Sequence, residues 1–293
     1  MAKKPKNRFI HNNVFILLLA VIGMVKPMYS QSPERDTTFH PYHVHYWVTG
    51  TIIGVGLSAN YFGTGLVFHK SDLSQLEIQA LNKDIFNGID SWALHQDPSK
   101  MAEFAKYSDY GVAVTVVLPV FLMFDKQIKQ DWFDVLLMYM ETMSITPNIY
   151  EWSPLGVNFQ NRIRPEAYYD QLSYDQRKSA NNRNSFYSGH EAVVTASTFF
   201  MVKVYSDYNP GIGDNKYLLY GAAMIPPLIE GYFRVKSLAH FPSDVMVGMG
   251  VGALCGILIP ELHRFHDKNI SLGLYSSSVA TGIAIKWQPD FVK

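Results

Sequence analysis

The sequence predicts an all-α fold, a helical bundle of about six core helices with a candidate site at helix ends and a small C-terminal β-hairpin. Two observations support the bundle. Six apolar segments follow residue 40, and each is longer than most strands. Two of these segments are preceded by helix-start signals, Ser188 with Glu191 three residues later and Pro242 with Asp244 in the first turn.

The first 30 residues have the pattern of a secretory signal peptide. Basic residues up to Arg8 precede an uncharged apolar run at 14–25, and small or polar residues follow around Ser30. We expect cleavage after Ser30, and retention of the segment as an uncleaved anchor is the alternative. The expected domains that follow are an apolar helix with an amphipathic segment (31–110), a helical catalytic domain (111–265) and a hairpin or tail (266–293).

The core helices follow in chain order. Residues 47–68 form the longest apolar run and predict the first helix. Residues 71–110 are polar with spaced apolar side chains from Leu76 to Ile89, which predicts one or two amphipathic surface helices. Further core helices are expected at 111–124, 133–150, 192–204, 217–229 and 245–260, and the alternating stretches 270–275 and 279–287 flank three serines and predict the hairpin.

Composition and charge exclude several classes of protein. Lysine plus arginine equals aspartate plus glutamate at 25 each, so no overall charge favours nucleic acid, and no nucleic-acid partner is expected. Cys255 is the only cysteine and lies in an apolar run, so an internal disulfide is excluded. An exported chain with so little cysteine fits a bacterial cell envelope, either periplasmic or membrane-associated.

Whether the helices cross a membrane stays open at this point. A crossing needs about 20 apolar residues, and only 47–68 reaches that length clearly. Glu141 lies within one apolar segment, and Pro226 with Pro227 interrupts another, as in a buried bundle. If the mature N-terminus were exported and all six segments crossed, the loop 151–187 would face the cytoplasm. A membrane-embedded protein and a peripheral or soluble one are both compatible with this pattern.

One group of functional residues precedes the last apolar segment. Arg234 is followed by His240 six residues later, and Asp244 lies four residues after the histidine. The simplest interpretation is a proline-started helix with an acidic first turn and an incidental histidine. The same spacing also lets the histidine donate one ring N–H to the carboxylate, which leaves its other nitrogen free to attack an electrophile.

Two further groups of candidate functional residues lie earlier in the chain. Ser188 and Gly189 open a helix, where backbone N–H groups can bind an anion, and His190 beside them can protonate a leaving oxygen. As a structural pattern, Ser188 and Glu191 predict a capping box, which leaves the histidine unexplained. Arg164 before Pro165 is uninformative alone, but a guanidinium is well suited to bind phosphate.

These residues resemble the type 2 phosphatidic acid phosphatase and vanadium haloperoxidase superfamily in order, spacing and position at helix ends, over roughly residues 133–262. The resemblance implies that His240 is the nucleophile, that Asp244 orients it and that His190 is the general acid. It implies no metal and no cofactor for a phosphatase. The implied phosphate-binding residues are Arg164, Ser188, Gly189 and Arg234.

The chain departs from the superfamily pattern at three positions. Tyr187 replaces the usual proline, and Phe233 replaces the usual serine. Val157 stands where the first motif has a lysine, seven residues before Arg164. Arg162 or a distant lysine is expected to supply the missing positive charge, and Arg162 is therefore a candidate auxiliary cation. An inactive relative is the alternative, although the retained His190, His240 and Asp244 argue against it.

The function implied by the resemblance is hydrolysis of phosphate monoesters or pyrophosphates, with lipid-linked esters favoured, through a phosphohistidine. The expected partners are a phosphorylated lipid or a small phosphate ester and a membrane. The alternatives are a vanadium-dependent haloperoxidase, in which vanadate is bound by His240, and an inactive envelope protein that binds phospholipid. The sequence selects neither a particular substrate nor an oligomeric state.

Overall fold

The computed structural model of this chain describes residues 40–264, 270–276 and 281–287. The chain divides into two units, Met1–Thr38 and Phe39–Lys293, and all the described residues belong to the second. The expected signal peptide lies outside the described residues. The described part is largely helical, and the predicted all-α fold is confirmed.

Four of the six predicted core segments, 47–68, 133–150, 192–204 and 245–260, each lie within one helix that extends beyond the apolar run. The pair Pro226 and Pro227 lies in the first turn of its helix, where proline is tolerated, so the segment 217–229 is divided between two helices. The predicted run at 111–124 covers the end of one helix and a following 3₁₀ turn, η4 (Leu118–Phe124). The long helices are α2 (Tyr46–Phe68), α4 (Met101–Val117), α6 (Trp132–Trp152), α8 (Gly189–Tyr208), α9 (Lys216–Ala223), α10 (Ile225–Lys236) and α11 (Pro242–Arg264).

The prediction of amphipathic helices over residues 71–110 was wrong for most of that range. Short turns replace them until α4 begins at Met101. Asn82 caps a single 3₁₀ turn through its side chain, and Gly88 has a φ of 62°, which ends regular structure on either side. The short elements of the chain are α3 (Gln75–Gln79), η1 (Lys83–Ile85), η2 (Gly88–His95), η3 (Pro98–Lys100), α5 (Lys126–Gln130), η5 (Pro165–Tyr168), α7 (Tyr174–Lys178), η6 (Ala180–Arg183) and η7 (Pro210–Asn215).

The C-terminal hairpin is also confirmed. Strand β1 (Ile270–Ser276) pairs antiparallel with β2 (Thr281–Trp287). The register places Ile270 opposite Trp287 and Ser276 opposite Thr281.

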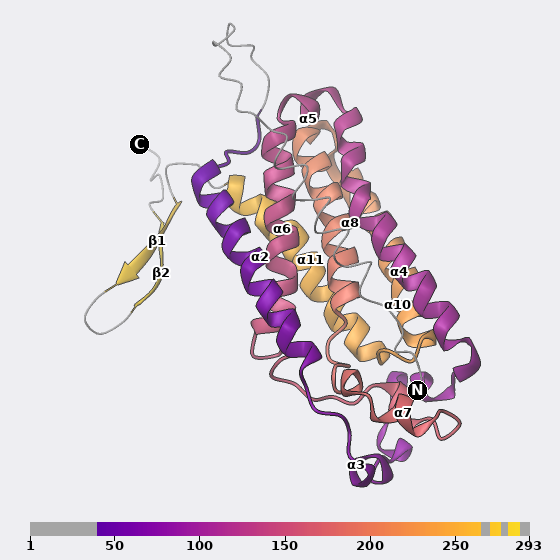
Figure 1. Ribbon diagram of the computed structural model, residues 1–293. Coiled ribbons are helices and arrows are strands. Elements are labelled where there is room, and N and C mark those ends of the chain that lie inside the picture. The colour runs from indigo at the N-terminus through magenta and orange to yellow at the C-terminus, as the bar shows by residue number, and fades with distance from the viewer. Residues whose placement is uncertain (1–39, 265–269, 277–280, 288–293) are drawn as a thin grey trace, which may run out of the picture. The chain divides into compact units, whose positions relative to one another are not determined.

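Helix α8 is the central element of the bundle. It packs against α4, α6, α10 and α11, while α2 packs on α6. As Figure 1 shows, the helices alternate in direction, so that α2, α6 and α10 end where α4, α8 and α11 begin. The segments that carry the predicted functional residues therefore meet at one end of the bundle, which we call the site end.

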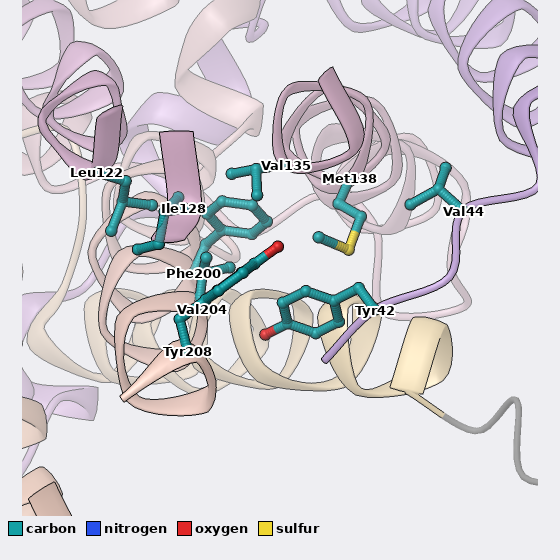
Figure 2. Close-up of a cluster of buried hydrophobic side chains, with 9 residues drawn as sticks. All are labelled: Tyr42, Val44, Leu122, Ile128, Val135, Met138, Phe200, Val204 and Tyr208. Carbon is teal, nitrogen blue, oxygen red and sulfur yellow. The ribbon is translucent and has the colours of Figure 1, made fainter. Parts of the chain in front are cut away.

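The opposite end of the bundle is closed by an apolar cluster, shown in Figure 2. Two tyrosines in it keep their hydroxyls paired, since Tyr42 donates to Asp207 at 2.6 Å and Tyr208 donates to Asp131 at 2.7 Å. This end fixes the chain that leads into α2. The cluster comprises Tyr42, Val44, Leu122, Ile128, Val135, Met138, Phe200, Val204 and Tyr208.

The outward faces of the helices are suited to lipid. Within the part of the chain that the structure describes, three helical stretches are long and apolar enough to cross a membrane, Tyr46–Phe68, Pro98–Phe124 and Pro242–Arg264. Glu141 does not face outward, because its carboxylate pairs with His263 at 2.9 Å inside the bundle. The chain therefore has the features of a membrane-associated protein. Large apolar side chains exposed on these stretches include Trp47, Val55, Phe62, Leu66, Val114, Phe121, Phe124, Leu254 and Leu258.

Three glycines of α11 allow that helix to touch α8 closely. Gly248, Gly252 and Gly256 recur every fourth residue and so lie on one face. A Cβ at Gly256 would lie 2.6 Å from the Ala196 carbonyl oxygen, closer than real contacts allow. Close backbone approach through small residues is a common way for apolar helices to associate.

We predict that Gly256→Ala destabilises the protein and that Gly250→Ala does not. The first substitution forces α11 away from α8, at a cost of about 1–3 kcal/mol. Gly250 is exposed on the same helix with nothing within 4 Å of a Cβ, so alanine there gains only its helix propensity. Thermal unfolding in detergent measures both variants, and equal melting temperatures would contradict the proposed close contact.

Candidate active site

The N-terminus of α8 is held by contacts to α11 as well as by its own cap. The Ser188 hydroxyl accepts a hydrogen bond from the Glu191 N–H at 3.4 Å, as a capping serine does. The predicted capping box is incomplete, because the Ser188 N–H donates instead to the backbone oxygen of Asp244 at 3.1 Å. The second and third motifs are thereby joined through the backbone.

Gly189 lies against an aromatic ring. A Cβ at this position would be 3.1 Å from ring carbons of Tyr150, so a larger residue would displace the start of α8. The unpaired N–H groups of this first helical turn are a suitable site for an anion. His190 follows, about one-third exposed, with its Nε2 3.7 Å from Oδ1 of Asp109 on α4.

His240 is buried, and a carbonyl fixes its ring. The chain turns sharply after α10, where Leu238 has a φ of 57° and the Ala239 N–H donates back to the Arg234 carbonyl at 3.1 Å. The imidazole follows, 1% exposed, with Nδ1 2.5 Å from the backbone oxygen of Ser185. A donor at Nδ1 leaves Nε2 unprotonated, as a nucleophile requires.

This geometry corrects the expected bond between His240 and Asp244. Their nearest atoms, Nδ1 and Oδ2, are 4.0 Å apart, which is too long for a hydrogen bond. Asp244 Oδ2 accepts instead from the Phe241 N–H at 2.8 Å and from the Ser185 hydroxyl at 2.6 Å. The carboxylate thus holds the residue whose carbonyl orients the histidine.

Arg162 has structural partners that the sequence did not indicate. Its guanidinium pairs with Asp244 and with Asp90 of η2, the latter at 2.7 Å, and it lies over the Phe241 ring. Asp90 also accepts from the N–H of Ser243 at 2.9 Å and from its hydroxyl at 2.7 Å. Arg162 therefore fastens the first-motif loop to the start of α11, and two carboxylates already balance its charge.

The two other predicted arginines are oriented differently. The Arg164 N–H donates to the Asn182 carbonyl at 2.7 Å, and its side-chain Nε donates to the Asn184 carbonyl at 3.3 Å. Arg234 is 6% exposed, and its Nη1 donates to the Ser108 hydroxyl at 3.1 Å. Neither guanidinium forms an ion pair within 4 Å among the described residues. Donors therefore remain available to an anionic ligand.

The electrostatics show that these groups share one environment. Burial, followed by the charges of Arg234 and Arg164, lowers the pKa of His240 well below its ordinary value. Burial and the neighbouring Arg234 also lower the pKa of Arg164 to about 10. At neutral pH the site therefore holds an uncharged His240 between two cationic guanidiniums.

Val157 does not present a polar group to the site. It is fully buried, and its N–H donates to the Tyr150 carbonyl at 2.8 Å. Lys70, which follows α2, donates to the carbonyls of Val157 and Gln160, both at 2.6 Å. Burial, with a smaller effect from Arg183, lowers the pKa of Lys70 to about 8. A distant lysine thus supports the loop where the motif lysine is missing.

Several of these contacts had no usable signal in the sequence. Ser185 was overlooked although it lies three residues before the recognised serine, because its role depends on a backbone carbonyl. Asp90 and Ser108 are more than 70 residues from their partners and lie in segments without a motif. Only the folded chain brings them to the site.

Comparison with known proteins supports the motif analysis. Residues 132–268 match the sequence model of the PAP2 superfamily, which confirms the resemblance inferred from the three motifs. No curated protein matches the chain. A crystal structure of a transmembrane PAP2 type phosphatidylglycerolphosphate phosphatase from Bacillus subtilis is similar at 18% identity and a TM-score of 0.42, over 73% of this chain and 98% of that one.

We predict that Asp90→Ala destabilises the protein, whereas Asp84→Ala has little effect. Removing the Asp90 carboxylate leaves Arg162 and Ser243 short of a partner, and each lost bond to a charged group costs about 1.5–3 kcal/mol. Asp84 is exposed in the neighbouring turn η1. The melting temperatures of the two variants are compared by thermal unfolding. Similar values would show that the Asp90 carboxylate does not stabilise the site.

Proposed function

We propose that this chain, with its PAP2 superfamily region at residues 132–268, is a phosphatase that hydrolyses phosphate monoesters or pyrophosphates. The observation that carries the proposal is the state of His240. Its ring is fixed through Nδ1, and its low pKa keeps it neutral beside Arg164 and Arg234. A neutral imidazole next to two cations is suited to attack an anionic phosphate.

The first chemical step forms a phosphohistidine. Nε2 of His240 attacks phosphorus as the bond from phosphorus to the leaving oxygen breaks. Arg164, Arg234, Ser188 and the Gly189 N–H bind the equatorial oxygens, where negative charge is concentrated in the transition state. Burial and the charge of Arg234 lower the pKa of His190 to about 4 in the empty site, and the negative charge of a bound phosphate raises that pKa again. His190 thus holds a proton in the complex and gives it to the leaving oxygen. The position of His190 at the anion-binding start of α8 supports this role.

The second step regenerates the enzyme. Water attacks the phosphorus of the phosphohistidine, His190 takes a proton from that water, and the bond between phosphorus and Nε2 breaks. Inorganic phosphate leaves, and His240 returns to its neutral form. Asp244 acts in both steps through Ser185, whose carbonyl holds the proton on Nδ1.

Lipid-linked phosphates are the substrate class that we propose. The last turns of α2 expose Leu66 and Phe68, on a helix long and apolar enough to cross a membrane. Asn184 donates to the Val67 carbonyl at 3.3 Å and accepts from Arg164, so the end of α2 is one residue from a phosphate-binding arginine. An acyl chain along α2 could therefore accompany a phosphate in the site. We further propose that the protein acts in the bacterial cell envelope.

We predict that His240→Asn abolishes turnover in a folded protein. Asparagine can keep the donor to the Ser185 carbonyl and removes the attacking nitrogen, so it suits a buried position. His190→Ala should slow hydrolysis of an alkyl phosphate by about 10²–10⁴-fold and that of p-nitrophenyl phosphate much less, because nitrophenolate needs no proton to leave. Wild-type rates for both variants on both substrates would disprove the mechanism.

We predict that Arg164→Gln and Arg162→Gln fail in different ways. Losing a phosphate-binding cation at Arg164 should weaken inhibition by orthovanadate roughly ten- to hundredfold, from about 1.5–3 kcal/mol per charged bond. Losing Arg162 should mainly lower the melting temperature, because its bonds are to Asp90 and Asp244. Inhibition constants and thermal unfolding are measured for each. Weaker vanadate inhibition in Arg162→Gln alone would make Arg162 the replacement for the missing lysine.

A further inference from the structure

Helix α4 lies outside the matched region 132–268, yet it contributes a buried side chain to the candidate site. Ser108 is fully buried, and its hydroxyl donates to Oε1 of Glu230 at 2.5 Å. The Ser108 hydroxyl oxygen accepts in turn from Nη1 of Arg234 at 3.1 Å. The serine therefore lies between a carboxylate and a guanidinium of α10.

Arg234 lies four positions after Glu230 on one helix, the spacing at which acidic and basic side chains usually pair directly. In the described structure they form no ion pair within 4 Å, although both are buried. Ser108 occupies the position between them instead. The carboxylate is near enough to compensate the buried positive charge without binding the guanidinium itself.

A direct pair would have a chemical consequence. A carboxylate that binds a guanidinium in the forked geometry uses two parallel N–H donors, the same donors that bind two oxygens of a phosphate. Glu230 and a phosphate would then compete for Arg234. With the serine in place, one N–H of Nη1 is used, and the other donors remain for a ligand.

We infer that Ser108 and Glu230 are positioning residues for phosphate binding, in which the serine hydroxyl keeps the carboxylate from capturing Arg234. The inference rests on the proposed function, because it assigns Arg234 to the phosphate oxygens. It gives α4, which carries none of the three motifs, a role in phosphate binding. Neither residue touches the substrate.

The experiment is a double-mutant cycle read by orthovanadate binding, measured by titration calorimetry of the full chain in detergent, so that it does not depend on turnover. Ser108→Ala should weaken vanadate binding roughly tenfold, since Glu230 can then pair with Arg234. Glu230→Gln alone should change binding less than about threefold. The double variant should bind about as well as Glu230→Gln, because a neutral amide does not capture the guanidinium.

The matched control is Ser197→Ala. Ser197 is also fully buried and bonds to α4, through the Thr115 carbonyl at 2.9 Å, but it lies further along α8 than His190. This variant should leave vanadate binding unchanged and should report the cost of losing a buried hydroxyl in the melting temperature alone. Arg234→Ala provides the second reference, and its vanadate binding should be abolished.

The outcomes separate the inference from the proposed function. If Arg234→Ala binds vanadate normally, the assignment of Arg234 to phosphate is wrong and the proposed function loses that residue. If Arg234→Ala abolishes binding while Ser108→Ala behaves like Ser197→Ala, only the present inference is overturned. The present inference is also overturned if the double variant binds vanadate more weakly than Ser108→Ala does. Additive losses of binding would mean that the serine and the glutamate act independently.

Discussion

The buried carboxylate of Asp244 joins segments that are far apart in the sequence. One oxygen pairs with Arg162 from the first-motif loop, and the other accepts from Ser185 and from the backbone at the start of α11. Its own carbonyl accepts the Ser188 N–H at the start of α8. A buried carboxylate is costly to leave without partners, so the loss of one contact weakens the reason for the others. The positions of the histidines and arginines depend on this arrangement.

The arginines of the site have two different electrostatic environments. Arg162 is neutralised directly by Asp90 and Asp244 and serves the structure. Arg164 and Arg234 have no such direct partner among the described residues, and their fields reach His240. A buried guanidinium that no carboxylate contacts directly is less favourable in the empty protein, and under the proposed function a phosphate dianion relieves that cost. Binding energy for an anion is therefore built into the folded state.

Most of the helices could be predicted from the sequence, because an apolar run longer than a typical strand usually forms a helix. The motif residues were also recognisable, since His190, His240 and Arg164 lie next to helix-start or proline signals. The partners of these residues were not. Local spacing favoured a bond from His240 to Asp244, but a sharp turn at Leu238 directs the ring to the Ser185 carbonyl. Arg162 was one candidate to replace the missing lysine, and its pairs with Asp90 and Asp244 could not be inferred from local spacing.

The direction of α2 has a consequence for sidedness. This helix begins at the far end of the bundle and ends at the site end, where Val67 accepts from Asn184. If α2 crosses the bilayer, residue 40 and the candidate site lie on opposite sides of the membrane. Cleavage of an export signal after Ser30 would leave residue 40 outside the cytoplasmic membrane and would place the candidate site on the cytoplasmic side. A candidate site on the outer side requires residue 40 on the cytoplasmic side, so signal cleavage and an outward-facing site exclude each other for a chain whose α2 spans the membrane.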